Sequence, residues 1–140
     1  MSTQALSAPV SAKLLSLPGA ARLSLGVVFA VFGLNGFLHF LPTPSGTPEA
    51  ALAFAGALVK TGYMFPLIKG TEVLVAALLL SNLFVPLALA LIAPVIVNIV
   101  AFHAALAPSG LGLALVLLAL ELYLAWTYRA AYRPMLAARG

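Results

Sequence analysis

Four long apolar stretches dominate the sequence, and few charged residues interrupt them. They run from about residue 23 to 41, 64 to 80, 84 to 106 and 111 to 128. As helices that rise about 1.5 Å per residue, they match a hydrocarbon core about 30 Å thick. With 64% hydrophobic and 7% charged residues, the chain lies far from the composition of soluble domains. We therefore predict an all-α fold, a polytopic membrane four-helix bundle.

The segments outside these stretches divide the chain further. Residues 1–20 are small and polar, which predicts a flexible cytoplasmic N-terminal segment with a short interfacial turn near Lys13. We expect the first apolar stretch to be a retained span, since the core of a cleaved signal would begin sooner. The four-helix transmembrane domain then covers 21–133, and 134–140 forms a cytoplasmic tail. The stretch from Glu49 to Thr61 is too short to span and predicts an interfacial or re-entrant helix after the first span.

The charged residues predict how the bundle is oriented. With four spans both termini share one side, which collects most of the basic residues, while the opposite loops offer Lys60. The residues on the side of the termini are Lys13, Arg22, Arg129, Arg133 and Arg139. Positive loops stay in the cytoplasm, so we predict a multi-pass protein of a bacterial inner membrane with both termini cytoplasmic. These basic residues form no patch with interleaved aromatics, so we predict no nucleic-acid partner.

The absence of cysteine limits the chemistry. No Cys occurs in the sequence, which excludes disulfides, thiol redox chemistry, cysteine-ligated iron–sulfur clusters and attached c-type haem.

Polar residues inside the spans fall into two layers once the orientation is fixed. Three of them lie about one helical turn from the outer end of their span, and three lie deeper. The shallow layer is His39, Lys69 and His103, and the deeper layer is Asn35, Glu72 and Asn98. Glu121 lies deeper still, near the midplane. Because such residues inside membranes usually face the bundle interior, we predict a ligand-binding or proton-handling pocket in the periplasmic half.

Each of these residues also has a structural interpretation. Lys69 and Glu72 are three residues apart and can neutralise one another, and Lys69 can extend toward the headgroups. Asn35 and Asn98 can form hydrogen bonds between helices. Glu121 is either protonated or paired across the bundle. The sequence leaves these alternatives open.

Three short segments stand out together: Gly33–Phe40 in the first span, Lys69-Gly70-Thr71-Glu72 in the second and Phe84–Ala88 at the start of the third. Taken together, they resemble the DoxX family of small bacterial four-helix membrane proteins. The resemblance covers roughly residues 20–135. It implies a four-helix bundle in the cytoplasmic membrane and an association with thiosulfate:quinone oxidoreduction or other membrane redox complexes. Family members often carry lysine near the end of the first span, where this chain has His39.

The leading functional hypothesis is an accessory subunit of a quinone-linked membrane redox system rather than a stand-alone enzyme. Its pocket would engage a quinone, another small lipophilic ligand or a membrane redox partner protein. Histidine and asparagine can donate hydrogen bonds to a quinone carbonyl, and Glu72 or His39 can pass the accompanying proton.

Three other hypotheses stay open. A small transporter or channel-like protein would use Glu121 as a deeper relay, but no internal repeat supports it unless the protein forms an oligomer. A structural scaffold would bind a partner span through the face of Gly33 and Gly36. A metal or haem site on His39 and His103, with Glu72 as a third ligand, lacks a ligand-spacing signature, so we predict no metal.

Overall fold

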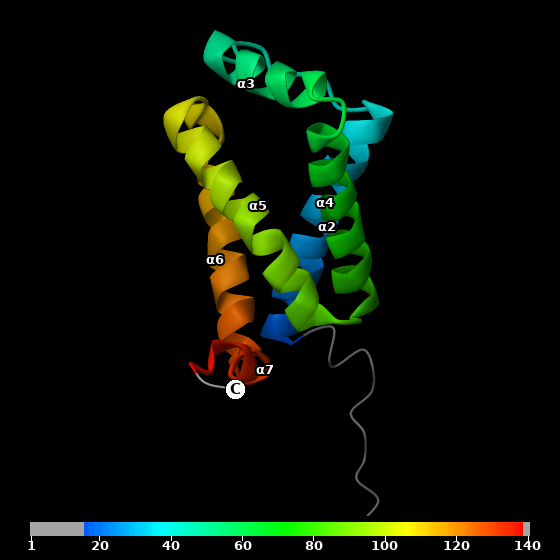
Figure 1. The fold of residues 1–140 in the computed structure, drawn as a ribbon, viewed down its shortest axis with the longest axis vertical. Helices are drawn as coiled ribbons and strands as arrows, with labels where there is room; N and C mark the ends of the chain where they lie inside the picture. Colours follow the sequence, from blue (N-terminus) through cyan, green and yellow to red (C-terminus); the bar gives the residue numbers. More distant parts are fainter. Residues whose placement is uncertain (1–15, 139–140) are drawn as a thin grey trace, which may run out of the picture.

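A computed structural model describes residues 16–138 as a bundle of helices (Figure 1). Four segments are long and apolar enough to cross a membrane: α2 (Leu17–Leu38), α4 (Met64–Ser81), α5 (Val85–Ala105) and α6 (Leu111–Thr127) with its preceding turn η1 (Pro108–Gly110). The shorter elements are α3 (Glu49–Lys60), α7 (Arg129–Tyr132) and η2 (Pro134–Leu136). The predicted all-α four-helix membrane fold is thus confirmed.

The first span begins and ends earlier than expected. It starts at Leu17 because the Ser16 side chain accepts a hydrogen bond from the Gly19 amide at 3.2 Å, and Pro18 suits a first helical turn. It ends at Leu38 because His39 adopts a left-handed conformation, with φ of 51°. Residues 17–20, predicted to be flexible, are therefore helical. The rest of that segment, including the turn near Lys13, and residues 139–140 of the tail lie outside the described residues.

Helix α3 lies crosswise over one end of the bundle (Figure 1). It does not enter the bundle, which is the arrangement expected of the interfacial alternative rather than of a re-entrant helix. We call this end the α3 end, and the opposite end, where α2 begins and α6 finishes, the terminal end.

Helices α2 and α4 pack closely because glycines on α2 bring the two backbones together. A Cβ on Gly33 would lie 3.0 Å from Val73 Cγ2 and 3.1 Å from Glu72 Cβ. A Cβ on Gly36 would collide with the methylene stem of Lys69. The expectation that Gly33 and Gly36 bind a span of a partner protein is therefore wrong, since α4 of the same chain covers this face.

Helices α5 and α6 form a second pair, joined by residues 106–110 at the α3 end. The two pairs are linked in sequence by residues 82–84 at the terminal end, where Asn82 and Phe84 adopt φ values of 58° and 49°. From this turn α4 and α5 diverge toward the α3 end (Figure 1). The pairs therefore form a wedge that is narrow at the terminal end.

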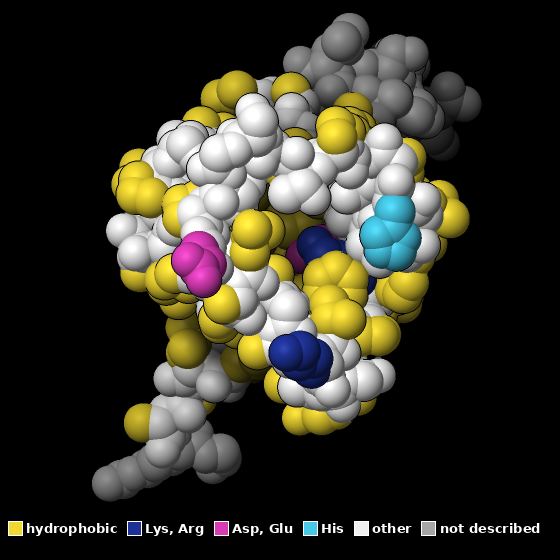
Figure 2. Space-filling model, turned by 90° about the horizontal axis from the view of Figure 1, so that it is seen from above, with side chains coloured by type: hydrophobic (Ala, Val, Ile, Leu, Met, Phe, Trp, Pro, Cys, Tyr) yellow, Lys and Arg dark blue, Asp and Glu magenta, His cyan; other side chains and the backbone are white. Residues whose placement is uncertain are grey.

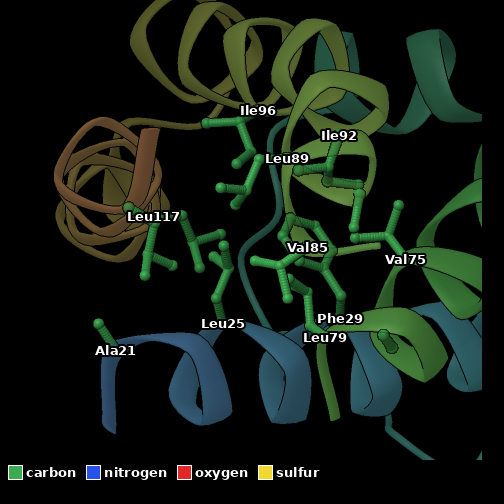
Figure 3. Packing of buried hydrophobic residues seen from close by; sticks show 13 residues of the cluster. Ala21, Leu25, Phe29, Val75, Leu79, Val85, Leu89, Ile92, Ile96 and Leu117 are labelled. Atoms are coloured by element: carbon green, nitrogen blue, oxygen red, sulfur yellow. The ribbon is translucent and has the colours of Figure 1, made fainter. Parts of the chain in front are cut away.

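The hydrophobic core fills the narrow part of this wedge. Its side chains point toward one another from α2, α4, α5 and α6 (Figure 3). Most of them come from the parts of α2, α4 and α5 nearest the terminal end, among them Ala21, Leu25, Val75, Leu79, Val85 and Leu89. The α3 half of the bundle is left with room between the pairs.

Arg22 joins the two helices of the first pair inside this packed half. Expected at the margin of a span, it instead lies within α2 and is 4% exposed. Its guanidinium donates a hydrogen bond to the Leu79 carbonyl in the last turns of α4. A cation is favourable at the C-terminal end of a helix, where carbonyl groups lack partners within the helix. Arg22 therefore has a structural role here.

Candidate functional site

A cavity of about 240 Å³ lies between the helix pairs in the α3 half of the bundle. Its polar lining consists of Lys69, Glu72, Asn98 and His103. Aromatic rings of Phe29, Phe32 and Phe102 and several aliphatic side chains line the rest. Seen from the α3 end, the surface is hollowed near its centre, with basic and acidic atoms at the bottom of the hollow (Figure 2). The lining of the cavity is mostly apolar with a few polar groups, as in most ligand sites.

Four of the six residues predicted for the pocket line this cavity, and two do not. Asn35 and His39 are absent from its lining. The Asn35 side chain accepts a hydrogen bond from the Leu41 amide at 2.7 Å, so it closes the end of its own helix. His39 is exposed and lies beyond the last residue of α2. The expectation that the polar residues of the first span face the pocket is therefore not met, whereas those of α4 and α5 do line the cavity.

Lys69 and Glu72 form an ion pair on one face of α4. The Lys69 ammonium lies 2.9 Å from Glu72 Oε2 and 3.2 Å from Oε1, and the two side chains are 20% and 3% exposed. The ammonium also lies 5.9 Å from the centre of the Phe65 ring. Because an ammonium has three N–H donors, at least one remains for a ligand while the pair stays intact. The carboxylate is held well inside the protein and the ammonium closer to the opening.

His103 is fixed by its backbone partner and by a glycine. Its Nδ1 lies 2.9 Å from the Ala107 carbonyl oxygen, which can only accept, so Nδ1 carries the proton. In the neutral ring, Nε2 is then an acceptor. The ring lies against Gly110, where a Cβ would collide with it. Phe102 packs edge-on against the imidazole, with ring centres 5.1 Å apart. The neutral imidazole therefore offers a ligand one nitrogen, Nε2, as a hydrogen-bond acceptor.

Asn98 completes the polar lining. It is exposed, lies inside a span and makes no side-chain hydrogen bond to any residue in 16–138. An amide without a partner at such a depth is free to bind a ligand or water. Asn98, Phe102 and His103 occupy one side of α5, as the spacing of four and five residues requires.

Sequence reasoning missed the aromatic walls and Gly110. A signal existed for Phe102, which stands four residues after Asn98 and so shares its helical face. The contact of Gly110 with His103 depends on how the turn after α5 folds back, and the sequence holds no sign of it. Phe102 in turn contacts Phe54 of α3, with ring centres 5.6 Å apart. Helix α3 thus reaches the rim of the cavity.

Glu121 lies apart from the cavity. It is 6% exposed on the buried face of α6, and its Oε2 has no hydrogen-bond partner in the described part of the chain. The ion-paired alternative for Glu121 is therefore not what the structure shows. Within residues 16–138 the structure brings together no group of three or more His, Cys, Asp or Glu that could hold a metal ion, so the set of His39, His103 and Glu72 that the sequence left open is not assembled.

The fold and cavity define the class of the chain as a multi-pass helical membrane protein with a polar cavity in one half of its bundle. No family model matches the chain, and no curated protein or solved structure matches it.

Proposed function

We propose that the protein is an accessory subunit of a quinone-linked membrane redox system and that its cavity holds the head group of a quinone or a similar flat lipophile. The observation that carries this proposal is the combination of free donors and one free acceptor between aromatic walls. Lys69 keeps one N–H free and Asn98 keeps its whole amide, while His103 Nε2 can accept. The similarity to DoxX proteins in the sequence points in the same direction.

The polar groups suit both oxidation states of such a ligand. The two carbonyl oxygens of a quinone accept hydrogen bonds, which the Lys69 ammonium and the Asn98 amide can donate. The hydroxyl groups of the reduced quinol donate, and His103 Nε2 and the Asn98 carbonyl oxygen can accept them. The rings of Phe29, Phe32 and Phe102 offer apolar surface to a flat ring. A cavity of about 240 Å³ accommodates the head group and leaves an isoprenoid tail in the bilayer.

The charge distribution supports a bacterial inner-membrane location with the α3 end in the periplasm. Arg129 and Arg133 lie at the terminal end, and Lys60 lies at the α3 end. Arg129 also anchors this end at the interface, since its guanidinium donates to the Trp126 carbonyl at 2.9 Å and lies 4.7 Å from the Trp126 ring. A ligand or a redox partner protein would then reach the cavity from the periplasm.

Replacing His103 by alanine is expected to weaken quinone binding about tenfold, the loss expected for one hydrogen bond of about 1.4 kcal/mol. The purified protein in mild detergent is titrated calorimetrically with a short-chain ubiquinone analogue. Gly110→Ala keeps the imidazole but displaces its ring, so it should weaken binding in the same direction.

The matched control is His39→Ala, because His39 is exposed at the same end and lies outside the cavity. It should bind like the unmodified chain. Equal affinities for the His103 and His39 variants would refute the cavity as the quinone site. Absence of binding to the unmodified chain, together with no quinone among lipids extracted from it, would refute the proposal as a whole.

A further inference from the structure

Glu121 is a buried carboxyl that the quinone site does not use. It lies on the α6 face that also carries Ala114, Leu117 and Leu124, all buried. Its Oε2 has no hydrogen-bond partner within residues 16–138. An ionised carboxylate without a partner in such surroundings is costly, and ionisable groups inside membranes commonly mark ion or proton pathways. A buried carboxyl without a partner therefore favours binding a proton.

Tyr132 connects the Glu121 region to the terminal end. Its hydroxyl donates to the Pro86 carbonyl at 2.8 Å, which holds α7 against the start of α5. Burial first, and then the nearby charge of Glu121 and Tyr128, raise the pKa of the Tyr132 hydroxyl. This hydroxyl therefore stays protonated. It can donate its proton only while it accepts another one. Tyr132 is half-buried at the terminal end, and it lies near enough to Glu121 for the charge of that carboxyl to act on its hydroxyl.

A thin apolar layer separates Glu121 from the cavity. Leu117 lines the cavity and belongs to the buried core, and so does Phe29 across the bundle. Leu117 and Glu121 are four residues apart on one helical face, a rise of about 6 Å. On the other side of this layer Glu72 faces the cavity, which opens at the α3 end. Glu121 and Glu72 thus lie on opposite sides of one layer of apolar side chains.

We propose that the bundle conducts protons between its two ends, with Glu121 as the station on the terminal side and Glu72 as the station on the cavity side. A proton enters from water at the terminal face through the Tyr132 hydroxyl and binds the Glu121 carboxylate. It then crosses between Leu117 and Phe29 on transiently admitted water to the Glu72 carboxylate. From there it leaves to water in the cavity, and the reverse direction uses the same groups. The membrane potential or the pH difference supplies the driving force, and no redox step is involved.

Within residues 16–138, few other charged groups lie near this route. Arg22 on α2 is buried, but its guanidinium donates to the Leu79 carbonyl on α4. At the terminal end, Tyr132 lies near enough to both Glu121 and Tyr128 for their charges to act on its hydroxyl. The parts of α4 and α5 nearest the terminal end, 73–81 and 85–97, carry no ionisable side chain. On the cavity side, Lys69 is paired with Glu72, and His103 stands across the cavity.

The test is proton flux into vesicles, which needs no quinone. The full chain is reconstituted into phosphatidylcholine vesicles that contain a pH-sensitive dye, and valinomycin with a potassium gradient sets the membrane potential. The protein should raise the rate of internal pH change above that of protein-free vesicles. Glu121→Gln should return it to that background. Glu49→Gln, an exposed carboxyl on α3, should leave the flux unchanged.

A second substitution keeps the test decisive if the Glu121 variant folds poorly. Leu117→Ala thins the apolar layer and should increase the flux, whereas Leu115→Ala, at a position 48% exposed on the same helix, should not. Flux equal to protein-free vesicles, or unaltered by both Glu121→Gln and Leu117→Ala, would overturn the proposal. This activity goes beyond the proposed quinone site, and its failure would leave the calorimetric result on His103 untouched.

Discussion

Replacing Lys69 by methionine is expected to destabilise the protein by about 3–5 kcal/mol, because the substitution leaves the Glu72 carboxylate buried without its partner. The Glu72 side chain is 3% exposed, so water can replace only a small part of what the ammonium provides. Glu72→Gln should cost less, since the Lys69 side chain is 20% exposed and its ammonium can turn toward water. Stability is measured as loss of helical circular dichroism on titration with a denaturing detergent.

The double variant Lys69→Met with Glu72→Gln separates charge pairing from packing. It leaves no charge buried and should recover most of the stability that the lysine substitution loses alone. Lys60→Met is the matched control, because Lys60 is exposed and has no ion-pair partner in the described chain, so its effect should stay within about 0.5 kcal/mol. Additive losses in the double variant would show that the pair is not coupled.

Gly33→Ala is expected to destabilise the bundle by about 1–3 kcal/mol, the usual cost of forcing an extra methyl group into a packed contact. The new methyl group would meet the Val73 backbone nitrogen at 3.1 Å as well as two side-chain atoms of α4. A backbone atom cannot move aside alone, so α2 and α4 would have to separate. The measurement is the same detergent titration.

Gly56→Ala is the matched control for this substitution. Gly56 also lies inside a helix, α3, and a Cβ there would have no atom within 4 Å. Because alanine favours the helical backbone by up to about 1 kcal/mol over glycine, this variant should be as stable as the unmodified chain or slightly more so. If Gly33→Ala behaved like Gly56→Ala, the close approach of α2 and α4 would be wrong.

Composition and the lengths of the apolar runs were sufficient to predict four spans. The bilayer requires a spanning helix to be apolar and to be long enough to cross the hydrocarbon core. Three of the spans begin and end within about two residues of the prediction. The first does not, because its start depends on a cap at Ser16 and its end on the left-handed conformation of His39. Which helices pair is decided by close contacts such as that of Gly33 with Val73, which hydropathy alone does not encode.

Helical geometry was sufficient to predict the polar part of the candidate site, whose residues lie inside the helices. Lys69 and Glu72 share a face of α4, and Asn98 and His103 share a face of α5, so depth and periodicity brought them together correctly. The same reasoning failed for His39, because the periodicity of a helix says nothing about a residue beyond its end. Arg22 was predicted as an orienting charge, and its bond to Leu79 required knowledge of where α4 ends.

The most direct test of the polar cavity at the α3 end uses the fact that the chain contains no cysteine. Single cysteines at Asn98, in the cavity, and at its neighbour Val97, which is 62% exposed but absent from the cavity lining, are treated in intact cells with a membrane-impermeant maleimide. With the α3 end in the periplasm, as proposed, the account predicts that Asn98→Cys is modified through water in the cavity, and that Val97→Cys, outside the cavity, is not. Failure of Asn98→Cys to react, or equal reaction at both positions, would contradict it.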